Sequence, residues 1–256
     1  MNQGTDFDTY AENYDSLLAK GLLITGEDKN YYARGRLVWL ARRLRMLHEI
    51  PRVVMDFGCG TGTGVPFILE HLGPTRLVGV DISVRSLEIA RRDYGCERVE
   101  FTLLRQDAAD GQIDLVFSNG VFHHIPPNKR DPVVRHVYRA LRPGGLFALW
   151  ENNPWNPGTR YIMRRCPLDK DAKMLAPHET KHLLRSHGFE ILSTDFLFIF
   201  PRVLRQLRRM EPILAKLPVG GQYQVLVRKP DERHSNTGDT NIVSAGTISD
   251  QGTSQS

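Results

Sequence analysis

The chain has 256 residues, of which 41% are hydrophobic and 25% charged, a balance typical of a globular protein with a sizeable core. Its formal net charge of +5 suits an anionic substrate, a membrane surface or RNA and selects none of them. No stretch approaches the roughly 20 continuous apolar residues of a transmembrane helix, and the first residues lack a signal-peptide pattern. Three scattered cysteines indicate neither a disulfide framework nor a zinc site. We therefore expect a cytoplasmic protein.

Strand-like and helix-like segments alternate along residues 1–230. Between the strand-like segments, apolar residues such as Leu37, Ala41 and Leu44 recur at helical spacing. Ser83 and Pro132 are expected helix starts, and the RPGG sequence at 142–145 is an expected stop before a strand. Strands are predicted over 52–57, 76–81, 98–104, 112–118, 145–151, 189–200 and 222–229. This alternation predicts a parallel sheet with helices on both faces and a ligand at the carboxyl ends of its strands.

A dense run of glycines follows the first predicted strand, in the sequence VVMDFGCGTGTG at 53–64. The dinucleotide pattern G-x-G-x-x-G fails here, because Thr63 stands where the third glycine is required. A P-loop is excluded because no lysine follows the glycines. What remains is an acid followed by three alternating glycines: Asp56, Gly58, Gly60 and Gly62.

This pattern resembles the first motif of the class I S-adenosylmethionine-dependent methyltransferases, and later motifs extend the resemblance over roughly residues 50–151. The second strand ends in VGVDIS, RQDAAD follows the third, the fourth reads IDLVFSNGVFHHIP, and ALRPGG precedes the fifth. The resemblance implies an α/β fold with a Rossmann-like, doubly wound, mainly parallel seven-stranded sheet flanked by helices. N-terminal helices and an insert helix before the last strand complete the expected fold. It also implies S-adenosylmethionine as cofactor and S-adenosylhomocysteine as product, and no metal is expected.

The resemblance also assigns cofactor-binding residues. Asp81 would accept both ribose hydroxyls, an arrangement that suits a carboxylate, and Ile82 would lie against the adenine ring. The alternative for Asp81 is a role limited to capping the helix that starts near Ser83. Asp107 and Ala108 match the adenine-recognition pair, with nearby Asp110 as the alternative loop acid. The other expected contacts are Tyr14 (with Tyr10 beside it), Asp56, Gly58, Cys59, Gly60, Gly62, Ser118 and Asn119.

Methyl transfer requires in-line positioning of a nucleophile, and a hydroxyl nucleophile usually benefits from a general base. Candidate catalytic residues are His123 and His124, which follow the fourth strand, and Glu151, which ends the fifth. The alternatives are a structural or cofactor-side role for the histidines and an ion pair with an arginine for Glu151.

Two segments after the fifth strand are candidates for the acceptor side. Segment 151–188 is expected to build part of the acceptor pocket, with Trp155, Tyr161 and nearby arginines lining an anion-accepting cleft. Residues 201–217 form an amphipathic pattern, which predicts a helix that either packs on the domain or meets anionic lipid. Pro212, after Glu211, is expected to kink or restart this helix.

We therefore predict an enzyme that moves a methyl group to an O or N of a small-molecule acceptor, with glycans and lipid-linked intermediates as candidate acceptors. DNA base methylation is disfavoured, because SNGV stands where DNA adenine methyltransferases carry a D/N/S-P-P-aromatic motif. The alternatives are a protein or RNA methyltransferase, favoured by a charge of about +8 over 1–230, and a non-catalytic cofactor-binding scaffold. The expected organisation is a helical cap (1–50), a cofactor-binding half (51–151), an acceptor-side half (152–230) and a disordered tail (231–256).

Overall fold

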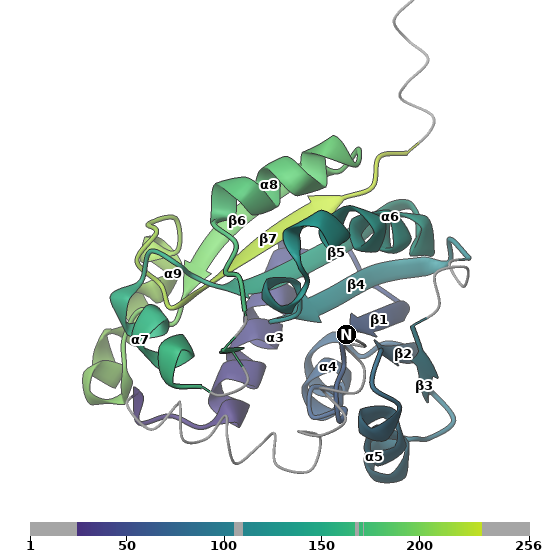
Figure 1. Ribbon diagram of the computed structural model, residues 1–256, viewed down its shortest axis with the longest axis horizontal. Coiled ribbons are helices and arrows are strands. Elements are labelled where there is room, and N and C mark those ends of the chain that lie inside the picture. Colours follow the sequence, from purple (N-terminus) through teal and green to yellow (C-terminus); the bar gives the residue numbers. More distant parts are fainter. Residues whose placement is uncertain (1–24, 105–109, 167–168, 171, 232–256) are drawn as a thin grey trace, which may run out of the picture.

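The computed structural model describes residues 25–104, 110–166, 169–170 and 172–231 (Figure 1). Tyr10, Tyr14, Asp107, Ala108 and nearly all of the predicted tail lie outside the described residues. Within the described residues the strands are β1 (Val53–Phe57), β2 (Arg76–Asp81), β3 (Val99–Leu103), β4 (Ile113–Asn119), β5 (Leu141–Asn152), β6 (Glu190–Leu197) and β7 (Gln222–Arg228).

These strands form one sheet in the order β3-β2-β1-β4-β5-β7-β6. The pairs from β3 across to β5 are parallel, and β7 runs antiparallel to both β5 and β6. The predicted mainly parallel, seven-stranded α/β sheet is confirmed. One boundary is wrong: the RPGG sequence lies inside β5, where Gly144 adopts a φ of 73° and its N–H donates to the Lys229 carbonyl at 2.9 Å.

The helices alternate with the strands as predicted: α3 (Lys29–Met46), α4 (Val65–Leu72), α5 (Val84–Tyr94), α6 (Arg130–Ala140), α7 (Pro157–Arg165), α8 (Pro177–Ser186) and α9 (Glu211–Leu214). Ser83 caps α5 as expected, accepting a hydrogen bond from the N–H of Ser86. The start predicted at Pro132 is two residues late. Helix α6 begins at Arg130, and Pro132 lies in its first turn, where a missing N–H costs nothing.

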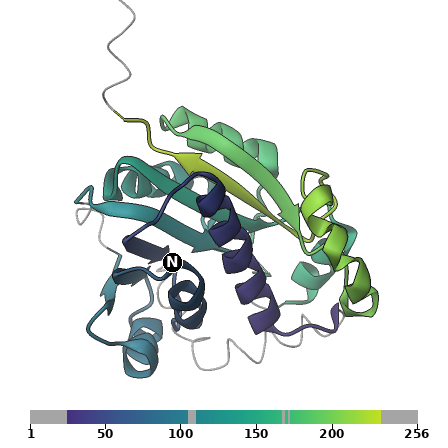
Figure 2. The same ribbon diagram turned by 180° about the vertical axis from the view of Figure 1, so that it is seen from behind.

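Apolar residues of the central strands alternate between two cores, one on each face of the sheet. On one face Val54, Leu115 and Ala148 pack with helices α3, α4 and α5. On the other face Met55 and Val116 pack with helices α6 and α8. Figure 1 shows α6 and α8 in front of the sheet, and Figure 2 shows α3 in front from behind. Helices cover both faces of the sheet, so the ends of the strands remain accessible to a ligand.

A buried carboxylate fixes α3 to the far end of the sheet. Asp195 of β6 is fully buried and accepts hydrogen bonds from Arg43, from Trp39 at 3.3 Å and from Lys216 at 2.7 Å. Burial alone would raise the pKa of Asp195, but the bonds from Arg43 and Lys216 hold that pKa below its ordinary value. Helix α3 is therefore held firmly against β6.

The insert between β6 and β7 differs from the predicted single helix. Residues Arg202–Met210 form a 3₁₀ helix, η5, and Glu211–Leu214 form the short α9, which restarts at the predicted Glu211-Pro212 step. The packing alternative for its apolar side chains is wrong, since no residue of η5 is buried. Among the described helices, none combines the length and apolar character needed to cross a bilayer.

Candidate active site

A cavity of about 1010 Å³ opens at the carboxyl ends of β1, β2 and β4. Its floor includes the glycine loop after β1, and Asp81 and Asn119 line it from the ends of β2 and β4. Residues of α3 and of segment 198–201 line one part of the wall, and residues of α7 line another. This volume is at the upper end of ordinary small-molecule sites, so it can hold a nucleoside-sized cofactor together with a small acceptor.

The glycines of the loop are required for different physical reasons. Gly58, Gly60 and Gly62 all have positive φ, between 53° and 78°. A Cβ on Gly58 would lie 2.3 Å from a Val121 methyl carbon, and one on Gly62 would meet the Tyr94 ring at 2.9 Å. Among the residues that the structure describes, no atom lies within 4 Å of the position that a Cβ on Gly60 would take. Gly60 lines the cavity, so the space beside it is available to a ligand.

Two carboxylates lie beside this loop. Asp81 accepts hydrogen bonds from the N–H of Gly60 at 2.8 Å and of Ser83 at 2.9 Å, so the ends of β1 and β2 are joined through one side chain. Asp56 is 5% exposed and lines the cavity. Burial, and then the negative charge of Asp81, raise the pKa of Asp56 to about 7, while Arg36 opposes the shift.

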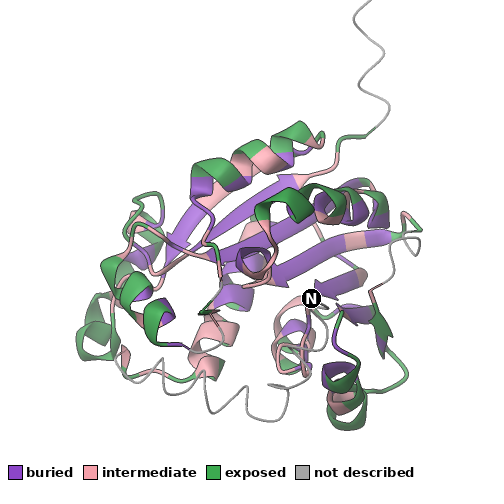
Figure 3. Ribbon diagram, in the orientation of Figure 1, coloured by how far each residue is buried: buried purple, intermediate pink, exposed green. Residues whose placement is uncertain are grey.

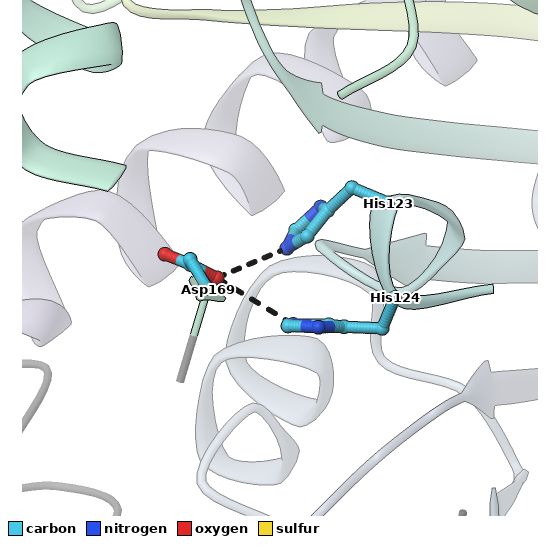
Figure 4. A group of neighbouring side chains, drawn as sticks. All are labelled: His123, His124 and Asp169. Carbon is cyan, nitrogen blue, oxygen red and sulfur yellow. Dashed lines mark ion pairs between the residues drawn. The ribbon is translucent and has the colours of Figure 1, made fainter. Parts of the chain in front are cut away.

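The two histidines after β4 have separate environments (Figure 4). His123 is buried, and its Nδ1 lies 2.6 Å from Glu151 Oε2 while its Nε2 lies 3.4 Å from Asp169 Oδ1. Glu151 also accepts hydrogen bonds from the N–H groups of Phe122, at 2.8 Å, and His123, at 3.3 Å. His124 Nε2 lies 3.6 Å from the same Asp169 oxygen, and His124 lines the cavity.

These environments give the two histidines different charge states at neutral pH. Burial works against a charged His123, yet Glu151 and Asp169 raise its pKa to about 10, so His123 is an imidazolium. Burial, and then the charge on His123, lower the pKa of His124 to about 4, so His124 is neutral. The arrangement therefore places a neutral imidazole at the cavity wall, supported by a charged one behind it.

His123, His124 and Asp169 each offer a ligand atom within 4.8 Å of one another, a set that could hold a metal ion. In this structure the imidazolium of His123 already lies between two carboxylates. These two carboxylates are the groups that His123 contacts through its ring nitrogens.

The cavity brings together most, but not all, of the predicted site residues within the described chain. Ile82 and Asn119 line it, whereas Ser118 is buried and does not. His123, Glu151 and Gly62 lie behind the wall. The predicted site residues that do line the cavity are Asp56, Gly58, Cys59, Gly60, Asp81, Ile82, Asn119 and His124.

Segment 151–188 contributes to the cavity as predicted, but with different side chains. Trp155, Tyr161 and the neighbouring arginines do not line it. Trp155 is exposed just before α7, and Tyr161 and the arginines are exposed on α7 itself. The residues of this segment that do line it are Asn152, Asn156, Gly158, Thr159, Ile162, Met163, Cys166 and Asp169. The predicted anion-accepting cleft is therefore wrong, and the wall here is mixed apolar and amide.

Sequence reasoning missed several residues of the site. Asp169 is brought to the histidines by a loop that follows α7, and no motif marks it. Arg36, Tyr31 and Tyr32 of α3 line the cavity, and the ring of Phe198 packs at 4.9 Å from that of Tyr32. A helical period at Leu37 and Leu44 indicated α3, but nothing in the sequence indicated which of its residues face a ligand.

Comparisons with known proteins agree with this geometry. Residues 55–147 match a family model described as a methyltransferase domain. The trans-aconitate 2-methyltransferase of Azoarcus sp. (strain BH72) is 32% identical over 116 residues, 44% of each chain. A probable S-adenosylmethionine-dependent methyltransferase of Mycolicibacterium smegmatis is 28% identical over 198 residues, 72% of each chain. An S-adenosylmethionine-dependent methyltransferase from Mesorhizobium loti has the same fold, with a TM-score of 0.53 at 23% identity, over 73% of this chain and 96% of its own.

Residues 55–147 therefore belong to a methyltransferase domain, and the fold around them is that of the class I S-adenosylmethionine-dependent methyltransferases. The resemblance inferred from the glycine loop and Asp81 is thereby confirmed. The chain spans less than half the length of the Azoarcus enzyme that it matches. The matched family region covers the glycine loop, Asp81 and both histidines of this methyltransferase, but ends before Glu151 and α7.

Replacing Gly60 with alanine should weaken cofactor binding without a large loss of stability. The left-handed φ of 53° costs an L-residue about 1–2 kcal/mol, and the added methyl group projects into ligand space. We expect Gly60→Ala to lower the calorimetric affinity for S-adenosylmethionine about tenfold or more. Gly73→Ala is the matched control, because Gly73 also has a positive φ and open space around its Cβ but lies outside the cavity. Equal affinity of the two variants would contradict this placement of the cofactor.

The His123 ion pairs should make the protein less stable in base. The folded pKa of about 10 exceeds the ordinary value of 6.5, so this contribution is complete below pH 6.5 and is lost as the pH rises towards 10. The facing groups are Glu151, Asp169 and His124. Urea unfolding of His123→Gln should show a flatter decline of the unfolding free energy between about pH 7 and pH 10. His182→Gln, on the exposed side of α8, should keep the parent slope; an unchanged slope in His123→Gln would count against the ion pairs.

Proposed function

We propose that this methyltransferase transfers the methyl group of S-adenosylmethionine to an O or N of a small-molecule acceptor. The observation that carries the proposal is one continuous cavity lined by the glycine loop, by Asp81 and by the neutral His124. Bound S-adenosylmethionine supplies an electrophilic methyl group on a sulfonium centre, and the protein's task is to align a nucleophile with it. The relative from Azoarcus is by its name a methyltransferase of a small carboxylic acid, which supports an acceptor of this size class.

The loop and the two acids fit the parts of this cofactor. In this proposal Asp81 accepts the ribose hydroxyls, and Ile82, 40% exposed beside it in the cavity, offers an apolar surface to the adenine. The open space beside Gly60 lets the methionine portion approach the backbone. Asp56 offers a carboxylate for the α-ammonium group, and Arg36 offers a guanidinium for the α-carboxylate.

His124 is our candidate for the general base, and the other two predicted catalytic residues act through it. His123 is already protonated, and Glu151 accepts hydrogen bonds from His123 and from two backbone N–H groups, so neither is placed to take a proton from an acceptor. The lowered pKa keeps the His124 imidazole unprotonated over a wide range of pH. His123 and Glu151 are positioning residues that hold the 3₁₀ turn η2 (Phe122–His124) and orient His124.

The acceptor-side wall supports a polar acceptor with an apolar portion. The hydroxyl of Thr159 donates to the Gly221 carbonyl at 2.8 Å, and Asn156 donates to the Val219 carbonyl at 2.8 Å, so these groups hold the wall together. Ile162 and Met163 lie next to them in the cavity lining. A glycan or lipid-linked intermediate, which has both kinds of surface, is the acceptor class that we propose.

Cofactor affinity should depend on the protonation of Asp56. With a pKa of about 7 in the free protein, Asp56 is mainly protonated in mild acid, and binding of an ammonium group would favour the ionised form. We expect S-adenosylmethionine to bind more weakly as the pH falls below about 7 and to release a proton on binding. Calorimetry in two buffers of different ionisation enthalpy measures that proton. Asp56→Asn should remove the pH dependence, and a variant that retained it would exclude Asp56 as its source.

Substitution of His124 should separate catalysis from cofactor binding. The first step is a screen that detects S-adenosylhomocysteine production with small metabolites, glycans, protein and RNA. With the acceptor in hand, we expect His124→Gln to lower kcat about 10²- to 10⁴-fold while the calorimetric affinity for S-adenosylmethionine stays unchanged. His182→Gln serves as the surface histidine control. Turnover on protein or RNA alone would replace the proposed acceptor class, and cofactor binding without any turnover would favour the scaffold alternative.

A further inference from the structure

A continuous segment beside the cavity exposes an unusual amount of apolar surface. Between β6 and β7, the 3₁₀ helix η5, the short α9 and the turn after them carry seven aliphatic or methionine side chains that are 41–88% exposed. We call this the η5–α9 surface; its apolar members are Val203, Leu204, Leu207, Met210, Ile213, Leu217 and Val219. Figure 3 shows η5 as an exposed element at the periphery of the molecule. Apolar side chains gathered in this way mark an interaction site.

Hydrogen bonds on its inner side hold this segment against the domain, so its exposed apolar side chains have fixed positions. Arg208 donates to Glu27 at 2.8 Å and to the Phe200 carbonyl at 3.1 Å, and its guanidinium lies over the Tyr31 ring. Glu211 is buried and accepts from the N–H groups of Ile199 and Phe200. The segment therefore contacts the domain through these polar side chains, and its apolar side chains remain exposed to solvent.

The charge of the segment is one-sided. Residues 198–221 contain five basic residues and one acid, and that acid is the buried Glu211. Arg208 and Lys216 form ion pairs with Glu27 and Asp195. Arg205 and Arg209 are exposed, and within the described part of the chain no ion pair is recorded for either. The outward side therefore combines apolar groups with two arginines that form no ion pair with another described residue.

This surface is continuous with the rim of the cavity. Residues 198–201 line the cavity, and η5 begins at the next residue, Arg202. At its other end the segment returns to the residues between β5 and α7, where Asn153 donates to the Pro218 and Gly220 carbonyls at 3.1 and 2.8 Å. The apolar surface and the acceptor wall are thus built from adjoining residues.

We propose that the η5–α9 surface docks this methyltransferase on a membrane leaflet that carries anionic lipids, with Leu204, Leu207 and Met210 entering the interface and Arg205 and Arg209 at the headgroups. Exposed aliphatic residues flanked by arginines, without acids, are the pattern of interfacial helices. A second copy of the chain fits less well, because a two-fold interface would bring the two arginines against one another. This inference goes beyond the proposed reaction and does not depend on it.

Co-sedimentation of the full-length protein with vesicles tests this inference directly. We expect binding to phosphatidylcholine vesicles that contain phosphatidylglycerol, little binding to phosphatidylcholine alone, and release by added salt. The triple variant L204S/L207S/M210S should lose binding. The double variant R205S/R209S should bind more weakly, by about fivefold for each arginine. Thermal unfolding should be near the parent value for all variants, because the substituted side chains are exposed.

Matched controls separate this surface from general effects of polarity and charge. Ile50→Ser removes an 84%-exposed apolar side chain that precedes β1, at the amino end of that central strand and away from the cavity. Arg98→Ser removes an exposed arginine before β3. Both controls should bind vesicles as the parent does. Calorimetry with S-adenosylmethionine on the same samples reports the cofactor site separately, so failure of one proposal leaves the other measurable.

Three results would overturn the inference. The first is failure of the parent protein to bind anionic vesicles at low salt. The second is undiminished binding by the triple variant. The third is self-association of the parent, measured by sedimentation velocity, that the triple variant abolishes, which would assign the surface to a second copy of the chain.

Discussion

The site depends on the pairing of β1 with β4 at the centre of the sheet. The two strands are parallel neighbours, with Phe57 opposite Ser118, although more than fifty residues separate them in the chain. The strand order reverses between them, so the connections that leave their carboxyl ends diverge to opposite faces and leave a crevice. Val121, just after β4, fills the space that a side chain at position 58 would need. The glycine loop and the histidine turn therefore share one contact, and each limits where the other can lie.

Two buried acids at the strand ends of this crevice meet different partners. Asp56 has another carboxylate, Asp81, as its charged neighbour, and its pKa rises towards neutrality. Glu151 instead receives two backbone N–H groups and the imidazolium of His123. One acid is thus able to respond to a cationic ligand, whereas the other is occupied in holding a turn. Both acids are almost fully buried, so burial does not distinguish them. Their different behaviour arises from the charged groups and N–H groups that each one contacts.

The local pattern of the sequence was enough to predict the sheet, its strand ends and the family. Strand β1, its glycines and Asp81 lie close together in sequence, so one short pattern contains all of them. Asp169 and Arg36 could not be predicted in this way, because their proximity to the site depends on long-range packing of α3 and of the loop after α7. The insert shows the other limit: its amphipathic pattern was correct, but periodicity cannot tell whether an apolar face meets the protein core or the outside.

Phe198 links the cavity to the surface that carries η5. It has a left-handed φ of 61°, a conformation that is costly for a bulky residue and persists only where the surroundings enforce it. Those surroundings are the Tyr31 and Tyr32 rings and Gly35 of α3; a Cβ on Gly35 would lie 2.6 Å from the Phe198 ring. Arg208 of η5 packs on the same Tyr31 ring. The rim of the cavity and the η5–α9 surface are therefore built on one aromatic cluster, and direct side-chain contacts join η5 to the cavity wall.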